Sequence, residues 1–157
     1  MEEEKRKIKA WQWVVLIIII ATTIGLKIYQ TRIPSVKMEL KNQTLDLMLA
    51  KTLKQRYKGL GERESLGLYD GMLFSYTLAG KPTMVMRGME FPIDIVWFND
   101  GVVVDIAPNA QIEPGVPEDA LKRYSPRIEA NLVLELKADW VEKNDLKIGD
   151  RIQVFSN

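Results

Sequence analysis

A long run of uncharged residues near the N-terminus constrains this chain more than any other feature of its sequence. Residues 10–26 carry no charge, and the run extends to residue 28 if Lys27 carries its amine to a membrane surface. At ~1.5 Å per residue, a helix over residues 10–28 would be about 28 Å long, which matches the hydrocarbon core of a bilayer. The sequence therefore predicts one N-terminal transmembrane helix, a signal anchor at residues 10–28.

The residues that flank this run predict its orientation. Basic side chains are dense before the run and sparser after it, and aromatic rings lie near both ends, where they favour the headgroup layer. The flanking residues are Lys5, Arg6, Lys7, Lys9, Trp11, Trp13 and Tyr29. This pattern favours a single-pass membrane protein with a cytoplasmic tail at residues 1–9 and the rest of the chain outside the cytoplasm.

Two other interpretations of the run stay open. Cleavage as a signal peptide would leave a secreted protein, although Ala21-Thr22-Thr23 is a poor small-residue cleavage site. A buried core helix is less favoured, because the run is apolar on every side. Beyond the run, residues 29–36 are expected to form a linker and residues 37–157 a single domain.

The residue types that are missing limit the chemistry of the chain. It contains no cysteine and no histidine. Disulfides, cysteine nucleophiles, Ser-His-Asp hydrolysis and ordinary zinc sites are therefore excluded. The formal net charge is +1, which indicates no basic surface for nucleic acid. We expect no cofactor and no nucleic-acid partner.

The domain is predicted to be mainly β. Short apolar runs are separated by glycine, proline and asparagine. Strands are expected at residues 36–40, 44–49, 71–76, 82–86, 93–98, 101–106 and 131–137, and residues 147–155 are expected to form a turn and a last strand. Asn42 and Asn99-Asp100 predict that the first two of these strands form one hairpin and that 93–98 and 101–106 form another. A short helix within residues 51–63 and a helical turn at 138–144 complete the elements, and residues 107–130 form a long proline-rich irregular stretch. The pattern predicts a small sandwich or barrel-like domain of short strands with a minor helix.

Several motifs occur in a fixed order along this domain. They are Arg56-x-x-Gly59-Leu60-x-x-Arg63, Gly71-Met-Leu-Phe74, Pro92-Ile-Asp94-Ile, Val133-Leu-Glu-Leu136 and Gly149-Asp150. The ordered set resembles the DUF192 family, also called UPF0127, over roughly residues 38–155. The resemblance implies a small β-rich domain that commonly carries a signal peptide or membrane anchor, in a family without an established activity.

Asp94 is an acidic residue in the middle of an apolar predicted strand. Alternation places it on the same face as Val96 and Phe98, and Ile95 on the opposite face. A buried carboxylate needs a partner, and the favoured one is an arginine or a set of loop N–H groups. In the functional interpretation, Asp94 instead lines a ligand pocket beside the proline-rich stretch. The basic candidates for that pocket are Arg56, Arg63 and Arg87.

Glu135 lies between apolar neighbours in another predicted strand, where we expect an exposed cross-strand partner of a basic residue. Under the alternative catalytic hypothesis, Asp94 and Glu135 form an acid and base pair as in glycoside hydrolysis. The same hypothesis includes carboxylate ligands for a divalent metal, with Asp70 and Glu90 as further candidates.

Three closely spaced methionines, Met84, Met86 and Met89, suggest a weak metal alternative. Thioether sulfur binds Cu(I), but methionine also fills irregular cores, and core packing is favoured here.

These features predict a membrane-anchored extracytoplasmic domain that has no catalytic activity of its own. It would be a binding or accessory module for a small polar or saccharide-like ligand, or for an envelope partner. A carboxylate-based, hydrolase-like or metal-dependent enzyme using Asp94 and Glu135 is the alternative. A purely structural partner of another membrane protein is a third possibility.

Overall fold

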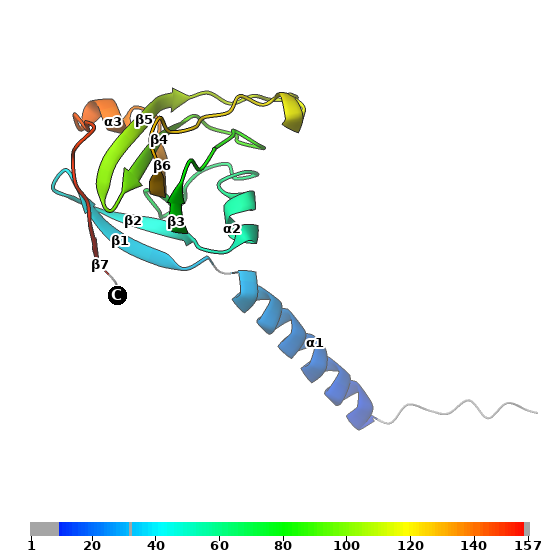
Figure 1. Ribbon diagram of the computed structural model, residues 1–157. Helices are drawn as coiled ribbons and strands as arrows, with labels where there is room; N and C mark the ends of the chain where they lie inside the picture. The colour runs from blue at the N-terminus through cyan, green and yellow to red at the C-terminus, as the bar shows by residue number, and fades with distance from the viewer. Residues whose placement is uncertain (1–9, 32, 156–157) are drawn as a thin grey trace, which may run out of the picture. The chain divides into compact units, whose positions relative to one another are not determined.

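The computed structural model describes residues 10–31 and 33–155, and the chain divides into two units, residues 1–32 and 33–157 (Figure 1). The first unit contains helix α1 (Ala10–Thr31), whose side chains are exposed from Trp11 to Thr23. Within the described residues, no helix combines the length and the hydropathy needed to span a membrane. The predicted cytoplasmic tail, residues 1–9, lies outside the described residues.

The second unit is built on one seven-stranded sheet. Its strands are β1 (Ser35–Leu40), β2 (Gln43–Ala50), β3 (Gly71–Gly80), β4 (Ile93–Asn99), β5 (Val102–Ala110), β6 (Ala130–Lys137) and β7 (Gln153–Phe155). They follow the spatial order β5-β4-β6-β3-β2-β1-β7, in which β2 and β3 are parallel and the other neighbours are antiparallel. The prediction of a mainly β domain is confirmed.

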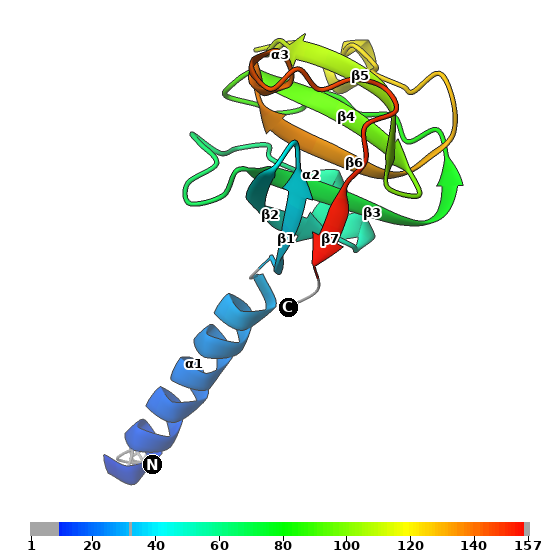
Figure 2. The ribbon, with the colours of Figure 1, turned by 90° about the vertical axis from the view of Figure 1, so that its left-hand side faces the viewer.

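The two edges of this sheet approach each other at one point. Val102, at the start of β5, forms an isolated bridge with Arg151, just before β7. The N–H of Val103 also donates to the carbonyl of Asp150 at 2.8 Å. Figure 2 shows the result, a strongly curved sheet in which β4, β5 and β6 form one layer and β1, β2 and β7 another.

Two tight turns fix the register of the hairpins. Lys41 and Asn42, with φ of 53° and 60°, join β1 to β2, and Asp100 and Gly101, with φ of 48° and 77°, join β4 to β5. Positive φ at both central residues gives a turn whose twist matches that of paired strands. Both hairpins that the sequence predicted are therefore confirmed.

The segment at residues 82–86 is not a strand, and that prediction was wrong. Met84 makes a single isolated bridge with Tyr124, and the indole Nε1 of Trp97 donates to the carbonyl of Pro82 at 3.0 Å. The segment is thereby tied to the sheet through Trp97. The side chains of Met84 and Met86 pack in the core on one face of the sheet, and the backbone of the segment does not pair with an edge strand.

The short helices agree with the sequence in place but differ in extent. Helix α2 (Leu53–Lys58) is shorter than the predicted range because Thr52 and Gln55 form a capping box at its start and Gly59, with φ of 52°, ends it. The other two are α3 (Trp140–Lys143) and the 3-10 helix η1 (Glu118–Ala120), which interrupts the proline-rich stretch. Strand β5 also takes the first residues of that stretch, up to Ala110.

Apolar side chains pack on both faces of the sheet. Leu47, Val96 and Phe98 belong to the cluster on one face, and Met72 and Phe74 to the cluster on the other. The second cluster also contains Met84, Met86 and Met89, which are 7%, 1% and 8% exposed. The three methionines thus fill the core, as the favoured interpretation expected.

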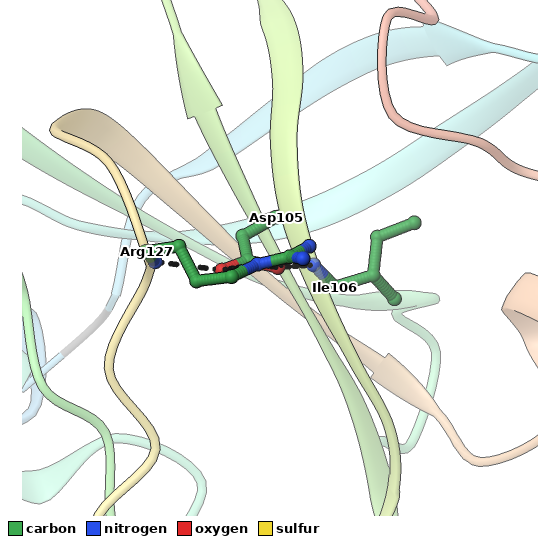
Figure 3. A network of polar contacts seen from close by, with 3 residues as sticks. All are labelled: Asp105, Ile106 and Arg127. Carbon is green, nitrogen blue, oxygen red and sulfur yellow. Dashed lines mark hydrogen bonds and ion pairs between the residues drawn. The ribbon is translucent and has the colours of Figure 1, made fainter.

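An ion pair ties the long connection before β6 to strand β5. Asp105 is 6% exposed and accepts hydrogen bonds from the backbone N–H of Arg127 at 2.7 Å and from its Nη2 atom at 2.7 Å (Figure 3). The side-chain hydrogen bonds from Arg127 hold the pKa of Asp105 below its usual value. The contact fixes residues near 127 against β5, on the route from η1 to β6.

Asp94 is fully buried and is held by backbone amides. Its Oδ1 atom accepts from the N–H of Asn109 at 2.7 Å, and its Oδ2 atom accepts from the N–H of Val141 at 2.8 Å. One carboxylate therefore connects β4 to the end of β5 and to α3. This arrangement matches the structural interpretation of Asp94, in which a carboxylate binds loop N–H groups.

We expect Asp94→Asn to lower the free energy of unfolding by about 2–4 kcal/mol, because the amide keeps one acceptor and leaves one buried N–H unpaired. Urea titration of the purified protein measures this change. Asp70→Asn is the matched control, because Asp70 is exposed and accepts one bond, from the N–H of Asp46 at 2.8 Å. Equal losses in both variants would contradict the assigned role of Asp94.

Candidate functional site

The pairing of β4 with β6 places the two candidate acidic residues, Asp94 and Glu135, on different faces of the sheet. Asp94 lies opposite Leu136, and Ile95 lies opposite Glu135. Directly opposed residues point to the same face of a sheet, so Asp94 and Glu135 point to opposite faces. The hypothesis of an Asp94–Glu135 acid and base pair is therefore wrong.

A cavity of about 560 Å³ lies over the Glu135 face of the sheet. It is bounded by α2, by residues 59–61, by β3, and by the covering segment at residues 83–89. Leu60, Phe74 and Met89 are among its buried apolar lining residues. We call this hollow the Glu135 cavity, because Glu135 is the one acidic residue among its lining residues.

Glu135 is buried in this cavity without a charged partner. It is 4% exposed, and its Oε2 atom has no hydrogen-bond partner in the described part of the chain. Its neighbours on the adjacent strands are Met72 and Ile95. The expected exposed cross-strand partnership is therefore wrong, because the Glu135 side chain is buried and its cross-strand neighbours are both apolar.

Burial raises the pKa of the Glu135 carboxyl to about 8. The physical cause is desolvation, which disfavours the charged form of the acid. At neutral pH the side chain is therefore mainly a neutral carboxylic acid. In that form it can donate one hydrogen bond as well as accept one.

Helix α2 and strand β3 place a cation and a phenol beside the acid. Arg56 donates from Nη1 to the carbonyl of Ser75 at 3.0 Å, and its guanidinium lies 4.8 Å from the centroid of the Tyr76 ring. Burial raises the pKa of the Tyr76 phenol, the charge of Arg56 opposes this, and Glu135 adds to it. Arg56, Tyr76 and Glu135 thus share one electrostatic environment.

The covering segment adds a second guanidinium to the lining of the cavity. Arg87 donates from Nη1 to the carbonyl of Tyr57 at 2.9 Å, stacks 4.1 Å from the centroid of that ring, and pairs with Glu118. Gly61 allows the close approach, because a Cβ there would lie 2.7 Å from the carbonyl oxygen of Arg87. The arginine therefore joins α2, the covering segment and η1 into one wall.

The arginines that the sequence proposed for a pocket have different positions in the structure. Arg56 and Arg87 line the Glu135 cavity, whereas Arg63 and Asp94 do not. The proline-rich stretch contributes to a smaller neighbouring hollow of about 180 Å³ that also includes Arg87. The predicted grouping is thus brought together in part, with Glu135 in place of Asp94.

Tyr76, Lys54 and Lys58 also line the cavity and were not proposed as site residues from the sequence. A signal for Tyr76 was present, because alternation along β3 places Met72, Phe74 and Tyr76 on one face. Nothing in the sequence indicated, however, that this face of β3 borders a cavity.

The carboxylate alternatives for a metal find no cluster in the structure. Across residues 10–31 and 33–155, acidic side chains do not gather in groups of three or more that could hold a metal ion. Asp70 and Glu90 are both exposed, and neither lines the Glu135 cavity.

The family model described as DUF192, an uncharacterised ACR, matches residues 35–154. The chain belongs to the DUF192 family. The match covers strands β1 to β6, the first two residues of β7 and every residue that lines the Glu135 cavity. The family resemblance predicted from the ordered motifs is therefore confirmed, and the description that accompanies the family names no activity.

Two crystal structures share the fold of this DUF192 domain. One, from Sinorhizobium meliloti 1021 and named as a candidate transcription regulator, has a TM-score of 0.68 and 26% identity and covers 79% of this chain and 96% of its own. The other, a protein of unknown function from Novosphingobium aromaticivorans DSM 12444, has a TM-score of 0.62 and 27% identity and covers 77% and 84%. The comparison with curated proteins gave no match.

We expect Glu135→Gln to flatten the dependence of stability on pH. The pKa of the folded acid is raised, so its contribution to stability is complete below about pH 4.5 and is lost as the pH rises to about 8. The loss has an upper bound of about 5 kcal/mol, from 1.36 kcal/mol per pKa unit.

Urea unfolding at pH 5 and pH 9 measures this effect, and the chain has no histidine or cysteine to titrate between them. The exposed Glu142→Gln variant is the control and should keep the wild-type slope. An unchanged slope in Glu135→Gln would show that the acid titrates at its ordinary pKa.

Proposed function

We propose that the DUF192 domain is a non-catalytic binding module and that the Glu135 cavity is its small-ligand site. The observation that carries this proposal is Glu135, which lines the cavity and whose buried Oε2 atom has no partner within the described residues. Leaving such an atom unsatisfied costs about 1–3 kcal/mol, which a ligand with a matching polar group would recover.

The composition of the cavity supports a ligand with both apolar and polar parts. Buried side chains such as Phe74 and Met89 offer apolar contact, while Arg56, Tyr76 and Glu135 offer hydrogen-bonding groups. Apolar walls with a few placed polar groups are typical of small-molecule sites. Saccharide-like ligands, which we expected from the sequence, should be among the first compounds tested for binding.

The absence of a second carboxylate in the lining argues against the enzymatic alternative. Glycoside hydrolysis of the ordinary kind uses two carboxyl groups across the scissile bond. The cavity supplies one, and Asp94 lies on the other face of the sheet. A binding role requires only the groups that are present.

We further propose that residues 10–28 anchor this module in a membrane, with the domain on the outer side. The proposal rests on the sequence, which has a charge-free run at residues 10–26 with basic residues concentrated before it. It is supported by the exposed apolar side chains of α1, among them Ile17, Ile18 and Ile19. Such a surface needs lipid or a partner to cover it.

Filling part of the cavity with a larger side chain should weaken ligand binding. We expect Val85→Trp to weaken any ligand found in a screen of sugars, nucleotides and small acids by at least about tenfold, because Val85 lines the cavity and is half-buried. Leu78→Trp, at an exposed position on β3 outside the cavity, should leave binding unchanged. Isothermal titration calorimetry measures both, and equal affinities would place the site elsewhere.

Cell fractionation tests the anchor separately. We expect the full-length chain to sediment with membranes, and a double change of Ile18 and Ile19 to Lys to release it, because each buried charge costs about 2.5–3.5 kcal/mol at a helix centre. Leu78→Lys, a similar change on the exposed domain surface, is the control. Wild-type protein found in the soluble cytoplasmic fraction would contradict the proposal.

A further inference from the structure

The charges around the Glu135 cavity are strongly one-sided. Four basic residues line it, Lys54, Arg56, Lys58 and Arg87, against a single acid. Lys58 and Arg87 have acidic partners, Glu62 at 3.6 Å and Glu118. Lys54 and Arg56 form no ion pair among the described residues, so their charges are not neutralised by the protein.

The single acid lies deeper than these cations. Glu135 is buried on β6, whereas Lys54 and Lys58 are exposed on α2. Arg56 lies between them, half-buried, with its guanidinium over Tyr76. The cavity therefore has a basic mouth and a floor that is apolar apart from one acid.

We propose that the Glu135 cavity selects small organic anions with an apolar body, and that such an anion binds while the Glu135 side chain is uncharged. This inference rests on the proposed binding function and names the chemical class of the ligand. The anionic group would lie at the mouth near Lys54 and Arg56, and the apolar body would fill the space above Phe74 and Met89.

The position of Glu135 makes such binding depend on protonation. Ionised Glu135 would repel the anion. The charged and titratable groups that line the cavity with it are Lys54, Arg56, Tyr57 and Lys58 from α2, Tyr76 from β3, and Arg87 from the covering segment. The adjacent strands present the apolar Met72 and Ile95.

The raised pKa of Glu135, about 8, gives the direction and the range of this effect. Anion affinity should be highest below that pH and should fall as the pH rises through it. At an effective dielectric constant near 20, two like charges about 10 Å apart correspond to roughly a tenfold loss of affinity.

Site-resolved NMR titration of the full chain tests the inference with two matched probes, 2-naphthoate and its neutral isostere 2-naphthamide. The amide signals of Gly59 and Gly61, which line the cavity, report binding there, and that of Trp140, outside it, is the internal control. At pH 6.5 we expect naphthoate to bind at least about fivefold more tightly than naphthamide. At pH 9.5 we expect naphthoate to bind about tenfold more weakly than at pH 6.5.

Two variants assign the pH effect to the acid. Glu135→Gln keeps a donor and should bind naphthoate with little dependence on pH. Glu135→Met is a second variant, for the case in which the buried glutamine side chain disturbs folding. Methionine matches the apolar neighbours of residue 135, and this variant should also lose the pH dependence. Lys54→Gln should reduce the preference for naphthoate over naphthamide, whereas Lys137→Gln, outside the cavity, should not.

The outcomes separate this inference from the proposed function. Equal binding of naphthoate and naphthamide would overturn the anion preference and leave the binding function standing. A pH dependence that is absent in the wild type, or that persists in both Glu135 variants, would overturn the role of the acid. If neither probe shifts the cavity amides and the wider screen finds no ligand, the inference and the proposed function both fail.

Discussion

The register of β6 against its two neighbours decides what each buried acid of this domain can do. Asp94 and Glu135 are one position apart across the β4–β6 pair, so they face opposite sides of the sheet. On one side, Asp94 meets the N–H groups of Asn109 and Val141, which satisfy both of its oxygens. On the other side, Glu135 meets Met72 and Ile95, and its Oε2 atom has no partner among the described residues. The same carboxyl group thus has both oxygens satisfied in one case and one oxygen unsatisfied in the other.

The cavity above Glu135 depends on how its cover is attached. The covering segment is held near its start, by the hydrogen bond from the Trp97 indole to the carbonyl of the preceding Pro82 and by the bridge between Met84 and Tyr124. At its other end, Gly61 and Arg87 bring it against the end of α2. These contacts hold the segment beside the sheet at points around the hollow and leave a space between them. A cavity framed in this way is part of the fold, which favours a site that exists before its ligand arrives.

Much of the sheet could be predicted from the sequence, because alternation and turn chemistry are local signals. The hairpins at Asn42 and Asp100 follow from residues that tolerate positive φ, and the faces of β4 follow from its apolar alternation. The prediction of a strand at residues 82–86 was wrong because the apolar content of this segment suits a covering layer as well as a strand. The prediction that Glu135 is exposed was wrong for a related reason. Whether an acid in a strand is exposed depends on what covers that face, and a pattern along one strand holds no information about the cover.

The identity of the site residues therefore follows from long-range packing, not from the motifs that reveal the family. Arg56, Gly59 and Glu135 all belong to the ordered motifs, but their spacing in sequence gives no reason to group them. From helix α2, Arg56 donates a hydrogen bond to the carbonyl of Ser75 on β3. The pairing of β3 with β6 then places Glu135 opposite Met72, on the face of the sheet that borders the cavity. The capping box of Thr52 and the turn at Gly59 position α2, so local signals at both ends of a six-residue helix determine where the cation lies. A change at either end of α2 would move Arg56 relative to Glu135 without altering a residue that touches a ligand.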